Sequence, residues 1–140
     1  MKDTNQLMNE LIKAHSIGDY LKENSSYMIS DELPVYLTNI LKKKGLVKSA
    51  VIKKSELSEV MGYQIFSGLR KPSRDSLLSI CIAMKLNIEE TQEILKIAQF
   101  ALLYPKVKRD CIIINGIVGG ESVAQINEKL FDNKENTLNK

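Results

Sequence analysis

The chain has 140 residues, of which 44% are hydrophobic and 26% are charged, and its formal net charge is +3. These fractions are close to the average for globular proteins and exclude a wholly disordered chain. There is no apolar run near the ~18 residues that a membrane-spanning helix needs, and the first residues lack the features of a secretory signal, so we expect a soluble, cytoplasmic protein with no membrane contact.

Apolar residues follow helical spacing almost throughout, and no strand-like alternation is sustained. The first predicted helix is capped by Asp3 or Thr4 and stops at Gly18. Its apolar face consists of Leu7, Met8, Leu11 and Ile12. The polar residues 23–26 predict a loop or a short helical turn.

Pro34, preceded by the acidic residues 31–32, predicts the start of a helix that runs to Lys44 and stops at Gly45. The apolar face of this helix consists of Val35, Tyr36, Leu37, Ile40 and Leu41. Between residues 47 and 68 the pattern predicts two short helices with a turn near residues 55–57.

After a break at Pro72 and Ser73, the apolar residues 77–84 predict a central helix. Asn87 begins a further helix that we expect to end at Pro105. The apolar residues of this helix are Ile94, Leu95, Ile97, Ala98 and Leu102.

The last predicted helices span about residues 106–118 and 122–131. Gly116, Gly119 and Gly120 superficially suggest the turn of a cofactor site. No strand–helix–strand context surrounds them, so we interpret the apolar run and its glycines as a helix followed by a break. The polar tail from residue 132 onward is expected to fray.

Residues that carry catalytic or metal chemistry are few. One histidine, His15, and two cysteines, Cys81 and Cys111, cannot supply an ordinary zinc site. Both cysteines lie in apolar runs, which is typical of packed, reduced thiols. Phosphate- and dinucleotide-binding glycine motifs are absent. We therefore predict that the protein is not an enzyme and uses no cofactor and no metal.

The positive charge is concentrated in one window. Residues 42–74 have a net charge of +7, whereas residues 1–41 have −3 and residues 75–140 have −1. Such a block favours a nucleic acid or another anionic partner. A lysine-rich face that is merely solvated is the alternative that charge alone leaves open.

The order of features across this window is helix, turn, helix, Gly-x-x-x-Pro and an apolar helix. Residues 44–95, KGLVKSAVIKKSELSEVMGYQIFSGLRKPSRDSLLSICIAMKLNIEETQEIL, resemble without a gap the helix-turn-helix of the XRE family, the Cro- and lambda-repressor-like DNA-binding domains. The positions that carry the resemblance include Gly45-Leu46, Val51, Leu57-Ser58, Ile65, Gly68 and Pro72.

The resemblance implies an all-α, lambda-repressor-like domain of five helices over residues 33–100. A partly helical N-terminal extension, residues 1–32, precedes it, and a C-terminal helix pair with a polar tail, residues 101–140, follows it. Within the domain, the helix at about residues 58–67 is expected to enter the major groove of double-stranded DNA.

The DNA-binding residues that the resemblance and the charge pattern imply are Lys48, Ser58, Glu59, Val60, Met61, Tyr63, Gln64, Arg70 and Lys71. Residues 59–61 are expected near base edges, with residues 63–64 one turn further on. Lys48 and Ser58 are placed near phosphates. Further phosphate contacts are assigned to Arg70, Lys71 and Arg74, and longer-range attraction to Lys42, Lys43, Lys44, Lys53 and Lys54.

Three of these assignments have open alternatives. Tyr63 either contacts a phosphate or base, or fills a gap beside Gly62 as a core aromatic. Gln64 either binds adenine through both amide atoms or is simply an exposed polar side chain. Arg70 and Lys71 either bind phosphate or only confer solubility.

Three positions depart from the XRE pattern. Ile52 stands where alanine is usual, which implies a wider helix crossing. Glu56 replaces the usual turn glycine, which requires a positive φ or a remodelled turn. Gly62 replaces a central isoleucine or valine and costs about 1 kcal/mol relative to alanine. We expect Tyr63 or its apolar neighbours to compensate by packing, or the helix to bend.

The function implied by the resemblance is that of a sequence-specific, DNA-binding transcriptional regulator, most simply a repressor that occludes a promoter. We expect a homodimer that pairs through the C-terminal helix pair or the N-terminal extension. The alternative is a protein–protein interaction module on a helix-turn-helix scaffold, with weak or no DNA binding. In that case Val60, Met61 and Tyr63 are apolar anchors for a partner.

Overall fold

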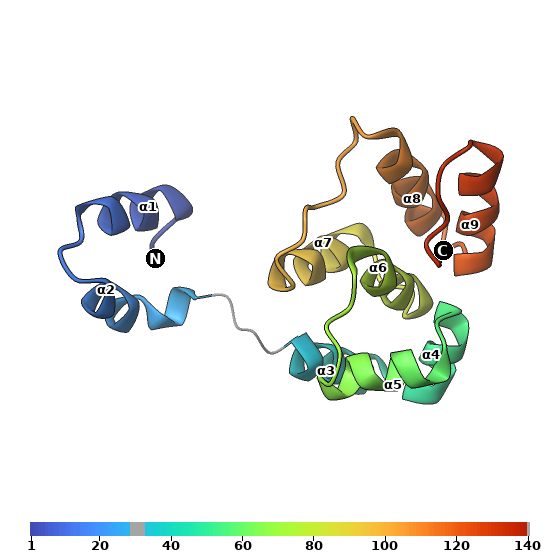
Figure 1. Cartoon of the computed structure of the whole chain (residues 1–140), viewed down its shortest axis with the longest axis horizontal. Coiled ribbons are helices and arrows are strands. Elements are labelled where there is room, and N and C mark those ends of the chain that lie inside the picture. The colour runs from blue at the N-terminus through green and yellow to red at the C-terminus, as the bar shows by residue number, and fades with distance from the viewer. Residues whose placement is uncertain (29–32, 140) are drawn as a thin grey trace. The chain divides into compact units, whose positions relative to one another are not determined.

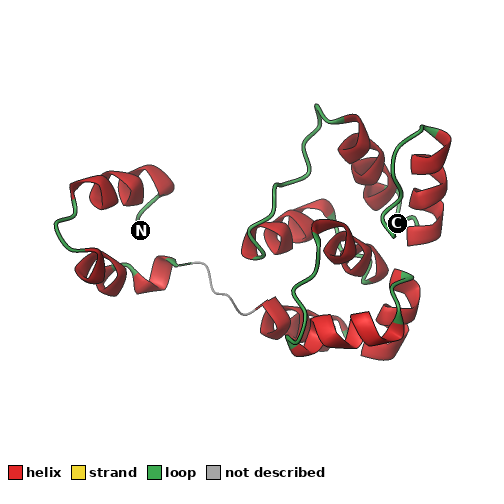
Figure 2. Ribbon diagram, viewed as in Figure 1, coloured by secondary structure: helices red, strands yellow, loops and turns green. Residues whose placement is uncertain are grey.

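The computed structural model describes residues 1–28 and 33–139, and all regular elements in these ranges are helices (Figures 1 and 2). The prediction of an all-α protein is confirmed for this part of the chain. Two compact units are present, Met1–Ser30 and Asp31–Lys140. The acidic residues 31–32, which we expected in a first helical turn, lie outside the described residues. No described helix is both long and apolar enough to cross a bilayer.

The first unit contains α1 (Thr4–Lys13), α2 (Ile17–Glu23) and the short 3₁₀ helix η1 (Ser25–Tyr27). Asp3 caps α1, because its carboxylate accepts a hydrogen bond from the backbone N–H of Gln6 at 2.8 Å. The prediction that the first helix stops at Gly18 is wrong. The helix ends at Lys13, and Gly18 lies inside a second helix whose N-cap is Ser16.

The second unit contains seven helices within its described residues. These are α3 (Leu33–Lys44), α4 (Lys48–Ser55), α5 (Glu59–Ser67), α6 (Arg74–Ala83), α7 (Ile88–Ile97), α8 (Lys108–Val118) and α9 (Val123–Asp132). As predicted, Gly45 ends α3 with a φ of 65°, and Asn87 caps α7 through its side chain.

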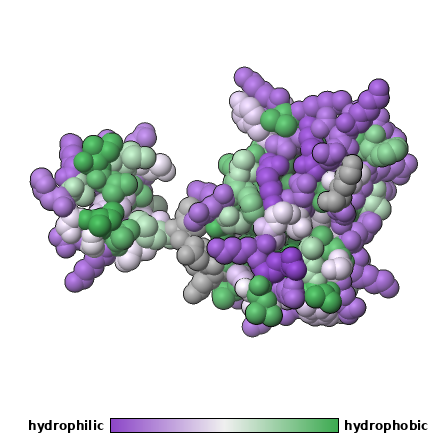
Figure 3. Space-filling model, viewed as in Figure 1, coloured by the Kyte–Doolittle hydropathy of each residue, from purple (hydrophilic) through white to green (hydrophobic). Residues whose placement is uncertain are grey.

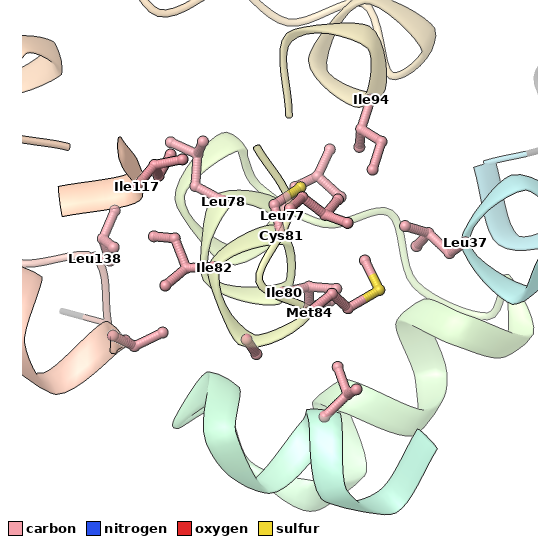
Figure 4. Packing of buried hydrophobic residues seen from close by; sticks show 14 of the residues in the cluster. Leu37, Leu77, Leu78, Ile80, Cys81, Ile82, Met84, Ile94, Ile117 and Leu138 are labelled. Carbon is pink, nitrogen blue, oxygen red and sulfur yellow. The ribbon is translucent and has the colours of Figure 1, made fainter. Parts of the chain in front are cut away.

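Helix α6 is central to this unit, as its apolar run predicted. Residues 77–84 are all buried. Figure 4 shows side chains of α6 and of its C-cap residue Met84 directed at several other elements. Met84 points toward Leu37 of α3, Leu77 toward Ile94 of α7, Leu78 toward Ile117 of α8, and Ile82 toward Leu138 of the tail. The helices therefore share one core built around α6.

Two expectations about helix faces and ends are wrong. Helix α7 ends at Ile97 and not at Pro105, because Gln99 adopts the left-handed region with a φ of 63°. Leu102 consequently lies in a loop and is 46% exposed. On α3, Val35 and Tyr36 are exposed, contrary to the prediction, whereas Leu37 and Leu41 are buried and Ile40 packs against the core as predicted; Leu33 is buried as well.

The polar tail folds back on the unit, so the expectation that it frays is wrong for its described residues. Leu138 is only 3% exposed, and its N–H donates to the side-chain oxygen of Asn127 at 2.8 Å. The side-chain amide of Asn139 donates to the carbonyl of Ser55 at 3.1 Å. The tail thereby connects α9 with the end of α4.

Candidate nucleic-acid interface

Helices α4 and α5 are joined by the turn Glu56-Leu57-Ser58. Glu56 has a φ of 62°, so of the two alternatives for this position the positive φ is observed. The hydroxyl of Ser58 accepts a hydrogen bond from the N–H of Met61 at 3.1 Å and caps α5, as predicted. These two residues fix the direction in which α5 leaves α4.

Gly62 lies buried on the side of α5 that faces α4. A Cβ built at this position would overlap Cγ2 of Ile52 and lie 2.9 Å from its Cγ1. Ile52 is itself only 3% exposed, so it fills the volume beside the glycine. Of the two alternatives for Tyr63, the one in which it fills this gap as a core aromatic is wrong, because Tyr63 is 40% exposed.

The first turns of α5 present a mixed surface. Glu59 and Val60 are exposed, Val60 by 66%, and Tyr63 is exposed one turn further on. Met61 is half-buried and packs against the core, where its sulfur accepts a hydrogen bond from the hydroxyl of Ser76 at 3.9 Å. The structure thus gathers three of these candidate residues on one surface and directs Met61 toward α6.

The end of α5 brings Gln64 and Arg70 together. Gly68 terminates the helix with a φ of 88°, as predicted, and the chain then reverses. The N–H of Arg70 donates to the Gln64 carbonyl at 3.2 Å, and its Nε donates to the Gln64 side-chain oxygen at 3.0 Å. The amide nitrogen of Gln64 and the terminal nitrogens of Arg70 are left outside this pair. The hydrogen bond between Gln64 and Arg70 was not predicted from the sequence, because the two residues are six positions apart and separated by a turn.

The other candidate cations lie around α4 and the loop after α5. Lys48 is half-buried at the start of α4, and its Nζ lies 5.8 Å from the ring centroid of Phe66. Lys71 is exposed beside Arg70. Leu69, which the motif did not single out, is 82% exposed in the same loop. The loop therefore presents one large apolar side chain between Gly68 and two cations.

Two bases of the positively charged window, Lys44 and Arg74, form ion pairs within the protein. Lys44 forms an ion pair with Glu90 at 3.0 Å. The pKa of Glu90 is held below its ordinary value, first because its carboxylate accepts a hydrogen bond from the backbone N–H of Asn87 and then because Lys44 is close. The structure thus partly neutralises the basic window at the end of α3.

The expected phosphate contact of Arg74 is wrong. Its guanidinium donates from two nitrogens to the carboxylate of Asp110 at 3.2 Å, and also to the carbonyl oxygens of Ala101 and Leu102. The side chain of Asp110 is 7% exposed, so this pair is largely removed from water. Arg74 therefore holds α8 and its preceding loop against α6.

The glycines that superficially suggested a cofactor turn have a packing role. Helix α8 ends at Val118, so the predicted break at Gly119 is confirmed. Gly116 lies inside α8, where a Cβ would overlap Ile126 of α9. The two helices approach closely at this point, and the glycine is explained without a ligand.

Comparison of the chain with protein-family models, with curated proteins and with solved structures finds no match.

Proposed function

We propose that the protein is a sequence-specific, DNA-binding transcriptional regulator of the cytoplasm, with a lambda-repressor-like helix-turn-helix domain over residues 33–100. The observation that carries this proposal is the surface of α5, where Tyr63 is exposed next to the hydrogen-bonded pair Gln64–Arg70. Tyr63 and Gln64 lie on a helix that begins at a sharp turn and ends at a glycine, and Arg70 follows just beyond that glycine.

The chemistry of this surface fits a DNA groove. A helix with its side chains is about 10–12 Å wide, which matches a major groove of about 12 Å. The Gln64 amide nitrogen and the Tyr63 hydroxyl can donate to base or phosphate oxygens, and Glu59 can accept from a cytosine amino group. Because Gln64 accepts from Arg70, its amide is held in one orientation.

The positive side chains near this surface would supply the sequence-independent part of the affinity. Arg70 and Lys71 are exposed beyond α5, Lys48 lies at the start of α4, and Lys53 and Lys54 are exposed near its end. Each phosphate that such a cation neutralises releases condensed counterions. Repression would follow from occlusion of a promoter, and a homodimer would read two half-sites.

A second candidate function is a protein–protein interaction module. The exposed apolar groups Val60, Tyr63 and Leu69 on and just after α5 favour it, as does the acidic Glu59 close to the turn. Aromatic and apolar side chains of this kind serve as anchors at protein interfaces.

Selection of bound duplexes from a random DNA pool by the full chain distinguishes the two functions. The proposal predicts enrichment of a defined motif, with Gln64→Ala relaxing preference at one base position and Arg70→Ala weakening binding to every sequence. Lys106→Ala, an exposed substitution outside the basic window, serves as the control and should leave the selected motif unchanged. A pool without enrichment and without retention at low salt would favour the interaction module.

A further inference from the structure

Taken by itself, the N-terminal unit leaves an apolar face exposed. Within residues 1–28 no apolar side chain is buried, and the one buried residue is Asn24. Figure 3 shows apolar side chains gathered across this unit. The large apolar side chains that are at least 40% exposed on α1, on α2 and just after η1 are Met8, Leu11, Ile12, Ile17, Leu21 and Met28.

Polar contacts hold the two helices of this unit together. The Nζ of Lys2 donates to Glu10 and to the side-chain oxygen of Asn24, both at 2.8 Å. The hydroxyl of Tyr20 donates to the carbonyl of Leu7 at 3.3 Å. This network joins α1 to the end of α2 without burying the six exposed apolar side chains named above, which we call the apolar stripe.

Such a unit is too small to be stable by itself. Helix α1 has ten residues and α2 has seven, and isolated helices shorter than about 12–15 residues are marginal in water. Units below about 40 residues need an additional source of stability, such as oligomerisation. The unit therefore requires another surface that buries its apolar stripe.

We propose that a second copy of this chain covers the stripe, so that α1 and α2 of two copies form a four-helix bundle. The proposal rests on the homodimer of the proposed function and gives it an interface. Six large apolar side chains expose several hundred Å² per copy, which approaches the roughly 800 Å² per partner of a standard interface. A two-fold axis makes the same stripe serve both copies.

The charges around the stripe are self-complementary. If two α1 helices pair antiparallel about Met8, Lys13 of one copy lies opposite Asp3 of the other. Each cation then also lies at the C-terminal end of its own helix, where the helix dipole favours it. Residues 1–28 carry three lysines and four acids, so two copies repel each other little. The same composition lacks the basic face that a helix needs to lie on an anionic membrane.

Sedimentation equilibrium of the full chain tests this interface, with paired substitutions of exposed residues. Ile12→Asp/Leu21→Asp changes the proposed stripe, and Val118→Asp/Phe131→Asp changes two exposed apolar residues of the C-terminal pair to the same degree. We expect a wild-type dimer, at least ~100-fold weaker association for the first variant, and wild-type association for the second. A wild-type monomer, or a dimer that only the second variant dissociates, would overturn the proposal.

Crosslinking gives a readout that does not depend on loss of association. In a Cys111→Ser background, Met8→Cys should form a disulfide-linked dimer under mild oxidation, and Val118→Cys should not. Failure of Met8→Cys to crosslink would contradict pairing about this residue. Binding of the same variants to random duplex DNA at low salt is measured separately. A wild-type chain that binds DNA as a monomer would overturn the interface alone, and a dimer that the first variant dissociates but that binds no DNA would overturn the proposed function alone.

Discussion

Ile52 on α4 occupies the space that a side chain at position 62 on α5 would require. The contact reverses the size order of the XRE helix-turn-helix pattern that we propose for this segment, in which position 52 is small and position 62 is large. The two departures from the pattern, Ile52 and Gly62, therefore compensate each other, because the larger side chain at position 52 fills the space left by the missing side chain at position 62. The absence of a side chain at Gly62 lets α5 approach α4 closely, and this approach sets where the exposed face of α5 lies.

Substitution of Gly62 tests this relationship. Alanine has the higher helix propensity by about 1 kcal/mol, yet Gly62→Ala should lower the free energy of unfolding by roughly 1–3 kcal/mol because its Cβ overlaps Ile52. In an Ile52→Ala background the same change should be neutral or stabilising. Urea unfolding of the four proteins in this double-mutant cycle measures the coupling. The matched control is Gly119→Ala, where a Cβ meets nothing closer than 3.4 Å.

A second prediction concerns the paired Arg-Asp dipeptides that join α6 and α8. Arg74 pairs with Asp110, and Arg109 pairs with Asp75. The two terminal nitrogens of Arg109 lie 2.9 and 3.0 Å from the carboxylate oxygens of Asp75. Arg74→Ala leaves Asp110 buried without its partner and should destabilise the second unit by about 3–5 kcal/mol.

Thermal or urea unfolding measures this loss. Arg70→Ala is the control, because Arg70 is exposed and forms no ion pair within the described residues. Since Arg74 is assigned to packing, its replacement should not reduce the salt dependence of DNA binding. A stable Arg74→Ala variant with a weakened salt dependence would show that Arg74 binds phosphate after all.

The folded-back tail gives a third prediction. Leu138→Ala removes a side chain that is 3% exposed and should cost about 2–5 kcal/mol, although the residue lies next to the end of the chain. The exposed Thr4→Ala or Glu128→Ala substitutions should have little effect. Equal unfolding midpoints for Leu138→Ala and wild type would mean that the tail does not contribute to the core.

The two thiols should differ sharply in reactivity. Cys81 is fully buried in α6, and burial raises the pKa of its thiol to about 12, so almost no thiolate exists at neutral pH. Cys111 is exposed, and its sulfur donates to the carbonyl of Pro105. A thiol reagent should therefore label Cys111 rapidly in the native protein and Cys81 only on unfolding. Rapid labelling of both would contradict the central position of α6.

Local signals in the sequence were sufficient for most helix ends. Ser58, Gly68 and Asn87 act within one turn of the helices that they cap or terminate, so their positions could be predicted from neighbouring residues alone. The α7 terminus was missed because a non-glycine residue, Gln99, adopts the positive φ there. Helix α2 was missed because Gly18 was interpreted as a stop signal.

Contacts between residues that lie far apart in the sequence could not be predicted from such local signals. Arg74 belongs to the basic window by sequence, but its partner Asp110 is 36 residues away. The tail is polar by composition, yet Leu138 enters the core through contacts that no local pattern indicates. For the candidate interface, the exposed residues of α5 could be predicted, whereas the Gln64–Arg70 hydrogen bond and the burial of Met61 depend on the turn and on α6.

The salt dependence of binding to a random-sequence duplex tests the central claim most directly. The account predicts that the logarithm of the affinity falls linearly with the logarithm of the salt concentration. Arg70→Ala/Lys71→Ala should reduce the slope by about two, because each cation neutralises one phosphate. Lys96→Ala/Lys106→Ala removes the same charge from exposed positions outside the basic window and should leave the slope unchanged. No binding at low salt, or equal slopes for the two double variants, would contradict DNA binding through this surface.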